Sequence, residues 1–274
     1  YQFDECIDLL ENLVNDGYYL ESTYYWLIAT YLKVGRLQEA QELLDRNLDD
    51  ENNMINQASI DICKKNYSHA RELLEYLIAT NESKRFEALF RLAFLALREE
   101  KYEEVIQTAD KILALYNYKL RTNEAISLYR VTAIAKVNLG IPVTGSGYYF
   151  SQISEYSKER AIEHIKTHFE STRGEGKFFP DMNLEETFEI IQDKINNMEP
   201  FHVGIKTAND TYLIDLENAG IVGNTMLNKM QVITFANTKK IITFYPVSRL
   251  SYNYETEEDI KPKKAPVKRL SQIE

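Results

Sequence analysis

Cysteine is scarce in this chain: the 274 residues contain only Cys6 and Cys63, each on the apolar face of a predicted helix. Two isolated thiols do not make the disulfide framework of small secreted domains, so we expect core thiols in a reducing cytoplasm. Long apolar runs are also missing. The best candidate, LFRLAFLAL, is interrupted by Arg91 and falls short of the roughly 20 residues that a membrane helix needs. No membrane partner is therefore expected.

An excess of positive charge is lacking as well. The 32 Lys and Arg are outnumbered by 42 Asp and Glu, which gives a net charge of −10. A broad nucleic-acid surface needs clustered Lys and Arg to neutralise phosphates, so a nucleic-acid partner is unlikely over most of the chain. With 44% hydrophobic residues the chain can bury a sizeable core. These features predict a globular protein of one large or two modest domains.

Residues 21 to 49 carry the clearest structural pattern in the sequence. Apolar residues recur at the spacing of one helix face on either side of a glycine, Gly35. The first stripe is Tyr24, Leu27, Ile28 and Tyr31, and the second is Leu37, Ala40, Leu44 and Leu48. Glycine accepts the left-handed backbone that ends a helix. The segment is therefore predicted to be two amphipathic helices joined by a tight turn.

This hairpin resembles the tetratricopeptide repeat, whose leucine, tyrosine, glycine and alanine positions are occupied here by Leu27, Tyr31, Gly35 and Ala40. Residues 2 to 15 resemble the second helix of a preceding hairpin, because Cys6 lies 34 residues before Ala40, which is the period of the family. The same signature returns 30 residues later at Ala70 and 35 residues after that at Val105. The resemblance implies an α-solenoid of antiparallel helix hairpins.

The helical pattern extends to residue 198, so a helical-repeat domain is predicted over residues 1–198. Its later helices include residues 123–139, with Asn123 as N-cap and Gly140 as stop, and a capping helix over residues 184–197 with Asn183 as N-cap. After Pro200 the pattern changes to short β-branched and aromatic runs, HVGIK, TYLIDL, KMQVITFA and KIITFYPV. Residues 200–250 are predicted to be a small antiparallel β module packed on the helices, and residues 251–274 a charged, mobile tail.

No catalytic, cofactor or metal site is predicted. His164 and His168 have the i, i+4 spacing of a zinc pair, but Ile165 stands where a hydrolase motif needs Glu, and no third ligand is placed. RGEGKFF at 173–179 lacks the Gly and the Ser or Thr of a phosphate loop. TGSG at 144–147 lacks the preceding strand of a dinucleotide fingerprint. Surface loops account for both motifs.

The family resemblance implies a binding groove lined by the first helix of each hairpin. Its positions are occupied by Tyr25, Ala29 and Lys33 in one repeat and by Phe90, Phe94 and Arg98 in another, with Arg130 at the rim. Such an aromatic groove with a basic rim suits an amphipathic or extended peptide. The alternative is that the rings of Phe90 and Phe94 pack on neighbouring helices or on the β module.

The leading hypothesis is a non-enzymatic, cytoplasmic adaptor or scaffold that binds a peptide or protein segment in this groove. The tail segment KPKKAPVKRLSQIE could itself be such a ligand, bound by the same molecule or by another. The second hypothesis is a nucleic-acid-associated regulatory protein that acts through the β module and the basic tail. In that case Lys229, Lys239 and Lys240 supply local positive charge. The two hypotheses differ in salt dependence, because only phosphate binding weakens steeply as salt is added.

Overall fold

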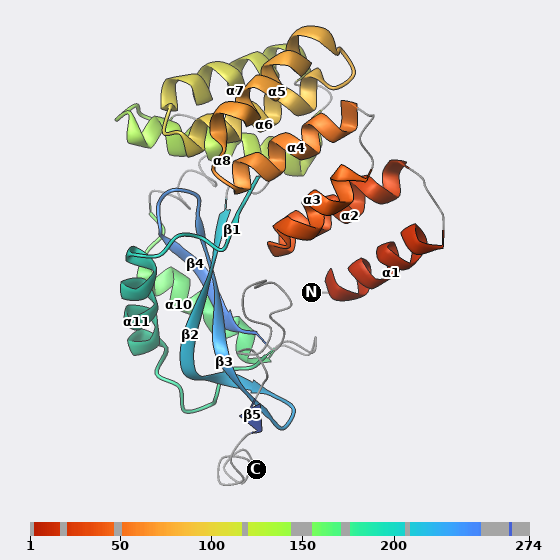
Figure 1. Ribbon diagram of the computed structural model, residues 1–274. Helices are drawn as coiled ribbons and strands as arrows, with labels where there is room; N and C mark the ends of the chain where they lie inside the picture. The colour runs from red at the N-terminus through yellow and green to blue at the C-terminus, as the bar shows by residue number, and fades with distance from the viewer. Residues whose placement is uncertain are drawn as a thin grey trace. The chain divides into compact units, whose positions relative to one another are not determined.

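The computed structural model describes residues 3–16, 21–46, 51–116, 120–143, 155–170, 176–205, 209–247 and 263–264. The chain divides into two compact units (Figure 1). The helical unit comprises Gln2–Glu155 together with Val203–Ala208, and the sheet unit comprises Tyr156–His202 and Asn209–Glu274.

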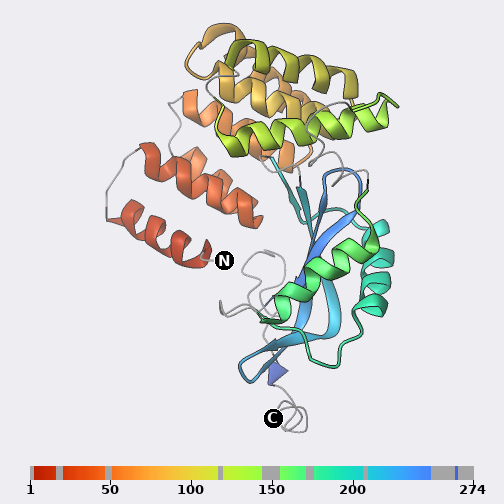
Figure 2. The same cartoon turned by 180° about the vertical axis from the view of Figure 1, so that it is seen from behind.

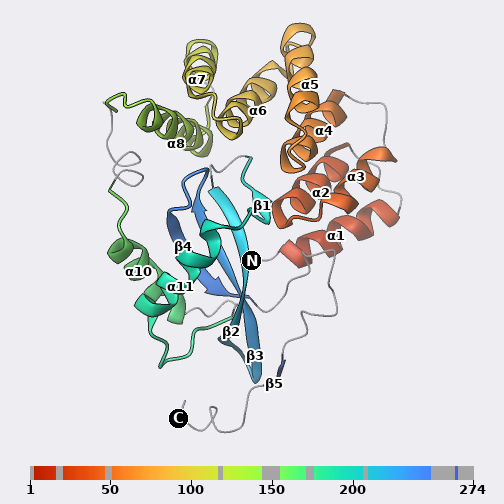
Figure 3. The same ribbon diagram turned by 60° about the vertical axis from the view of Figure 1, so that its left-hand side comes forward.

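The described part of the helical unit is built from helices α1 to α8. They are α1 (Phe3–Asn15), α2 (Glu21–Val34), α3 (Leu37–Asp45), α4 (Glu51–Cys63), α5 (Tyr67–Thr80), α6 (Arg85–Arg98), α7 (Tyr102–Tyr116) and α8 (Thr122–Asn138). Consecutive helices pack on each other, and α4 also contacts α2 and α6, while α6 contacts α8. The helices α2, α4, α6 and α8 therefore form one layer (Figure 3), which we call the first-helix face.

Four helices of this layer end in the same way. Gly35, Lys65, Glu100 and Gly140 follow α2, α4, α6 and α8, and all have left-handed backbones, with φ of 82°, 62°, 59° and 67°. In each case the next amide donates to a carbonyl five residues back, as from Arg36 to Tyr31 at 2.9 Å and from Lys101 to Ala96 at 2.9 Å. This bond closes a helix C-terminus. The sequence predicted it at the two glycines, whereas a lysine and a glutamate take the same conformation at the other two turns.

The repeat signature marks the interior of the helical unit. Ala40, Ala70 and Val105 are fully buried, as their spacing predicted. In α1 the pattern is out of phase, because Ile7 is buried while Cys6 is exposed. The expectation that Cys6 is a core thiol is therefore wrong. Helix α1 packs on α2.

In the sheet unit the helices precede the strands along the chain. They are α10 (Lys158–Lys166), the 3-10 helix η2 (Thr167–Glu170), α11 (Leu184–Asn196), β1 (His202–Val203), β2 (Asn209–Val222), β3 (Thr225–Phe235), β4 (Ile241–Pro246) and β5 (Lys263–Lys264). The strand order is β1-β2-β3-β4, and β5 pairs with β3. The β2–β3 and β3–β4 pairs are antiparallel, as predicted.

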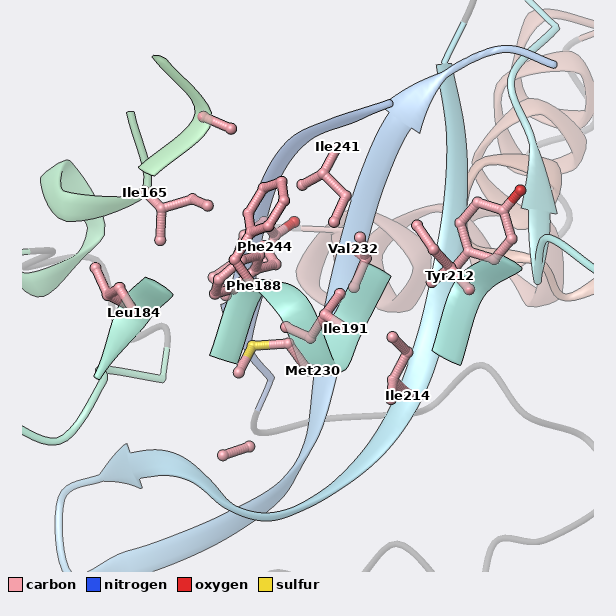
Figure 4. Packing of buried hydrophobic residues seen from close by; sticks show 14 of the residues in the cluster. Ile165, Leu184, Phe188, Ile191, Tyr212, Ile214, Met230, Val232, Ile241 and Phe244 are labelled. Atoms are coloured by element: carbon pink, nitrogen blue, oxygen red, sulfur yellow. The ribbon is translucent and has the colours of Figure 1, made fainter. Parts of the chain in front are cut away.

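One face of this sheet supplies the core of the sheet unit. Tyr212, Val232 and Phe244 stand opposite one another on β2, β3 and β4. Their side chains form one cluster with apolar residues of α10 and α11 (Figure 4). From α11 this cluster receives Leu184, Phe188, Ile191 and Ile195. Helix α10 packs against β4 and α11 against β2; seen from behind, α10 (green) crosses in front of the strands and α11 (teal) lies at their side (Figure 2).

Three predicted boundaries differ from the structure. The predicted helical domain ended at residue 198, but α10 and α11 bury their apolar faces on the sheet, because an amphipathic stripe does not specify which apolar surface it covers. The strands β2 and β3 extend beyond their predicted ends to a tight turn at Gly223, where φ is +55°. The N-cap of α8 is Arg121 rather than Asn123. The N-cap at Asn183 is confirmed, since its side chain accepts from the Glu186 amide at 3.1 Å.

Several expectations concern residues outside the described part. The loop motif at 144–147 lies there, as does the predicted tail except for Lys263 and Lys264, which pair with Met226 and Thr225 of β3. Among the helices that the structure describes, none combines the length and the apolar character needed to cross a bilayer.

Candidate peptide-binding surface

The predicted groove residues lie on helices of the first-helix face. Tyr25, Ala29 and Lys33 follow one another at i, i+4 and i+8 along α2, and Phe90, Phe94 and Arg98 do the same along α6. Residues at this spacing share one side of a helix. Arg130 lies on α8 and is partly buried. As the helical pattern in the sequence predicted, these residues lie on helices.

The two phenylalanines are interior rather than surface residues. Phe90 is 7% exposed and Phe94 is 1% exposed. They continue a row of rings along α6, with centroid distances of 5.8 Å from Phe86 to Phe90 and 5.4 Å from Phe90 to Phe94. Phe86 also meets the ring of Tyr116 on α7 edge-on, at 5.2 Å. This burial agrees with the alternative prediction, in which the rings pack inside the protein.

A polar network joins α2 to α6. The Tyr25 hydroxyl donates to Glu87 Oε1 at 3.1 Å, and Arg91 Nη2 donates to the same oxygen at 2.9 Å. Burial raises the pKa of Tyr25, and the negative charge of Glu87 raises it further. The phenol therefore stays protonated at neutral pH and remains a donor. Arg91 is itself only 4% exposed, so this ion pair is an internal support and not a docking charge.

The remaining α2 positions are more accessible. Ala29 is half-buried, and Lys33 is exposed at the last turn of α2. Partial desolvation of its ammonium group lowers the pKa of Lys33 from the ordinary lysine value. Tyr25, Ala29 and Lys33 together form a mixed apolar and basic surface on α2.

The end of α6 holds a segment that is distant in sequence. Arg98 Nη2 donates to the carbonyl oxygen of Gly204 at 3.1 Å. Val203 and Ile205, on either side of this glycine, are 5% and 7% exposed. All three belong to the helical unit, although the chain before and after them belongs to the sheet unit.

Val203 is part of a core cluster of the helical unit. Its partners in that cluster come from α4, α5 and α6: Ile55, Ala58, Ile62, Ala70, Leu74, Leu77, Ala88, Leu92 and Leu95. A non-helical segment thus contacts the helices both by apolar burial of Val203 and by a charged hydrogen bond to the backbone of Gly204. The sequence assigned HVGIK to the β module; of its described residues 202–205, His202 and Val203 are strand. Nothing in the local pattern distinguishes this segment from the other β-branched runs.

His164 and His168, the candidate zinc pair, have a packing role in the structure. The rings of His164 and His168 meet edge-on with centroids 5.5 Å apart. His168 Nε2 is 3.0 Å from the hydroxyl of Thr243 on β4, and its ring packs against Tyr245 at 5.4 Å. Within the described ranges, no group of three or more His, Cys, Asp or Glu residues could hold a metal ion.

The described residues of the phosphate-loop candidate at 173–179 also pack within the sheet unit. Lys177 forms a backbone bridge to Ile221, and Phe178 belongs to the core of the sheet unit. Residues 171–175 lie outside the described part.

Two of the three lysines proposed for nucleic-acid binding are engaged within the sheet unit. Lys229 is 6% exposed and pairs with Asp215 at 3.0 Å. Lys239 Nζ donates to the carbonyl oxygens of Ile195, Asn196 and Met198, at 2.9, 2.8 and 2.9 Å. These contacts close the end of α11 and orient the ammonium group toward the protein.

No family model matches the chain, and no curated protein matches it. Among solved structures, two crystal structures of MamA are similar, each at 18% identity with a TM-score of 0.36. They cover 60% and 62% of this chain and 90% and 88% of their own.

Proposed function

We propose that the protein is a non-enzymatic scaffold whose helical unit binds an extended peptide or protein segment on its first-helix face. The observation that carries the proposal is the contact of the helices with Val203 and Gly204. It supports a binding mode in which an arginine contacts a main-chain carbonyl while the β-branched side chain before it, here Val203, enters an apolar cluster. The tetratricopeptide-like pattern and its four equivalent helix ends also support the proposal.

This mode of recognition explains which ligands the surface would accept. A guanidinium that donates to a backbone carbonyl does not distinguish one ligand side chain from another. The sequence preference for the ligand must therefore come from the ligand's apolar positions. Burial of one valine side chain contributes about 1.5–3 kcal/mol, and a hydrogen bond from a charged donor adds about as much. Ordering a flexible peptide offsets most of this gain. We therefore expect affinities of roughly 10 to 1,000 μM for short peptides.

A peptide array probed with the full chain tests this proposal. The array contains ten-residue peptides that vary two positions separated by one glycine. We expect the retained peptides to carry Val or Ile at both positions, and we expect Arg98→Met to reduce their binding about tenfold. Lys111→Met, at an exposed position on α7, is the matched control and should leave binding unchanged.

Salt dependence separates this proposal from the nucleic-acid hypothesis. Peptide binding by apolar burial should change less than threefold between 50 and 500 mM salt, whereas phosphate contacts would weaken it by orders of magnitude. Retention of no peptide at all, or equal retention by wild type and Arg98→Met, would refute the proposed mode.

A further inference from the structure

The segment Val203–Ile205 occupies part of the surface to which the proposed function assigns a partner. The chain leaves the sheet unit after His202, contributes Val203, Gly204 and Ile205 to the helical unit and returns to the sheet unit at Asn209. Val203 ends the short strand β1, yet its side chain is buried in the apolar cluster of α4, α5 and α6, and Ile205 is also buried. Segments that only connect elements usually run over the surface.

We propose that Val203–Ile205 is an internal ligand that autoinhibits the helical unit, so that a partner segment must displace it to bind. This inference rests on the proposed function and adds its regulation. The partner is an extended segment of another protein with the chemistry that the internal ligand displays, namely two β-branched apolar side chains flanking a glycine.

Two contacts carry the inference. The carbonyl of Gly204 takes the hydrogen bond of Arg98 at 3.1 Å, which a partner's backbone would need. Val203 fills a position in the apolar cluster of α4, α5 and α6, which a partner's side chain would need. A partner cannot make either contact while the internal segment makes it, so the two are mutually exclusive.

Tethering determines how strongly the internal segment competes. A ligand attached through a short connection is present at an effective concentration of about 1 mM. If the free segment binds with a dissociation constant of about 0.1 mM, the tethered copy weakens the apparent affinity of a partner about tenfold. This magnitude permits regulation and still lets a partner with more contacts displace the segment.

The test measures binding of a labelled synthetic peptide with the sequence of residues 199–208 to the full chain. Val203→Thr combined with Ile205→Thr keeps the β-branched shape but introduces hydroxyl groups into an apolar site, so it should release the internal segment. We expect this double variant to bind the peptide about tenfold more tightly than wild type. A peptide of the same composition in scrambled order is the control.

The outcomes separate the two proposals. If the peptide binds wild type and double variant equally, the autoinhibition is refuted while the peptide-binding surface stands. If the peptide binds neither, although circular dichroism shows both folded, the proposed function fails as well.

A measurement on the wild-type chain covers the case in which the variant does not fold. Amide hydrogen exchange of residues 202–205 should be slow in the chain alone and should accelerate when unlabelled peptide is added in excess. Two results would overturn the inference. One is rapid amide exchange of residues 202–205 in the chain alone, and the other is exchange of these amides that does not change when the peptide binds.

Discussion

Lys239 offers a sharp test of how the sheet unit is held together. Its ammonium group donates to three carbonyl oxygens, those of Ile195, Asn196 and Met198, at 2.8–2.9 Å. The last carbonyls of a helix lack partners within the helix, and a cation there also meets the negative end of the helix dipole. Replacement by Met keeps the length of the side chain and removes the charge.

The expected cost follows from these contacts. Hydrogen bonds from a charged donor contribute about 1.5–3 kcal/mol each when they are well buried. Lys239 is half-buried, so water can replace part of the interaction in the variant, and the contributions do not add fully. We therefore expect Lys239→Met to destabilise the sheet unit by about 2–3 kcal/mol.

Amide hydrogen exchange of β3 measures this loss, because buried central strands exchange only through large openings of the unit. Lys194→Met, at an exposed position in the last turn of the same helix, is the control and should cost less than about 0.5 kcal/mol. A loss below about 0.5 kcal/mol for Lys239→Met would refute the reasoning. If the variant instead kept its stability and lost affinity for an oligonucleotide, the nucleic-acid hypothesis would gain support.

Two further predictions concern the helical unit. Glu100 has a left-handed backbone that costs a side-chain-bearing residue about 1–2 kcal/mol, so Glu100→Gly should stabilise the unit by about 1 kcal/mol in urea unfolding, and Gly35→Ala should do the opposite. A loss of stability in Glu100→Gly would contradict this. Burial opposes ionisation of Glu99, but hydrogen bonds from Lys101 and Arg71 outweigh it and lower the pKa of Glu99. The stability that this depressed pKa contributes is present above the ordinary glutamate pKa and is lost as the pH falls through the folded-state value. Glu99→Gln should therefore flatten the acid limb of the stability curve, and an unchanged limb would show that other groups dominate it.

Local rules predicted much of the helical unit. The turn at Gly35 and the buried Ala40 and Ala70 follow from spacing and from the backbone freedom of glycine. In the sheet unit, the N-cap at Asn183 follows likewise from the preference of its side chain for an amide two or three residues ahead. Such features depend on neighbours in sequence, which is why a single sequence reveals them. The left-handed turn at Lys65 escaped prediction because no residue type marks it.

The remaining differences involve partners that are distant in sequence. Helix α11 has the stripe expected of a capping helix, but the surface that it covers is the sheet. Phe90 and Phe94 occupy positions that the family resemblance assigns to a groove, and the sequence cannot tell whether other parts of the chain bury them. The contact between Arg98 and Gly204 joins positions 106 residues apart, and neither residue carries a local signal of it.

The affinity of the residue 199–208 peptide for the chain that carries Val203→Thr and Ile205→Thr tests the central claim most directly, because the competing internal segment is released there. Fluorescence anisotropy should show saturable binding in the range of roughly 10 to 1,000 μM, and Arg98→Met in this background should weaken it about tenfold. Absence of saturable binding in a folded chain, or binding unaffected by Arg98→Met, would contradict the account of the first-helix face as a peptide-binding surface.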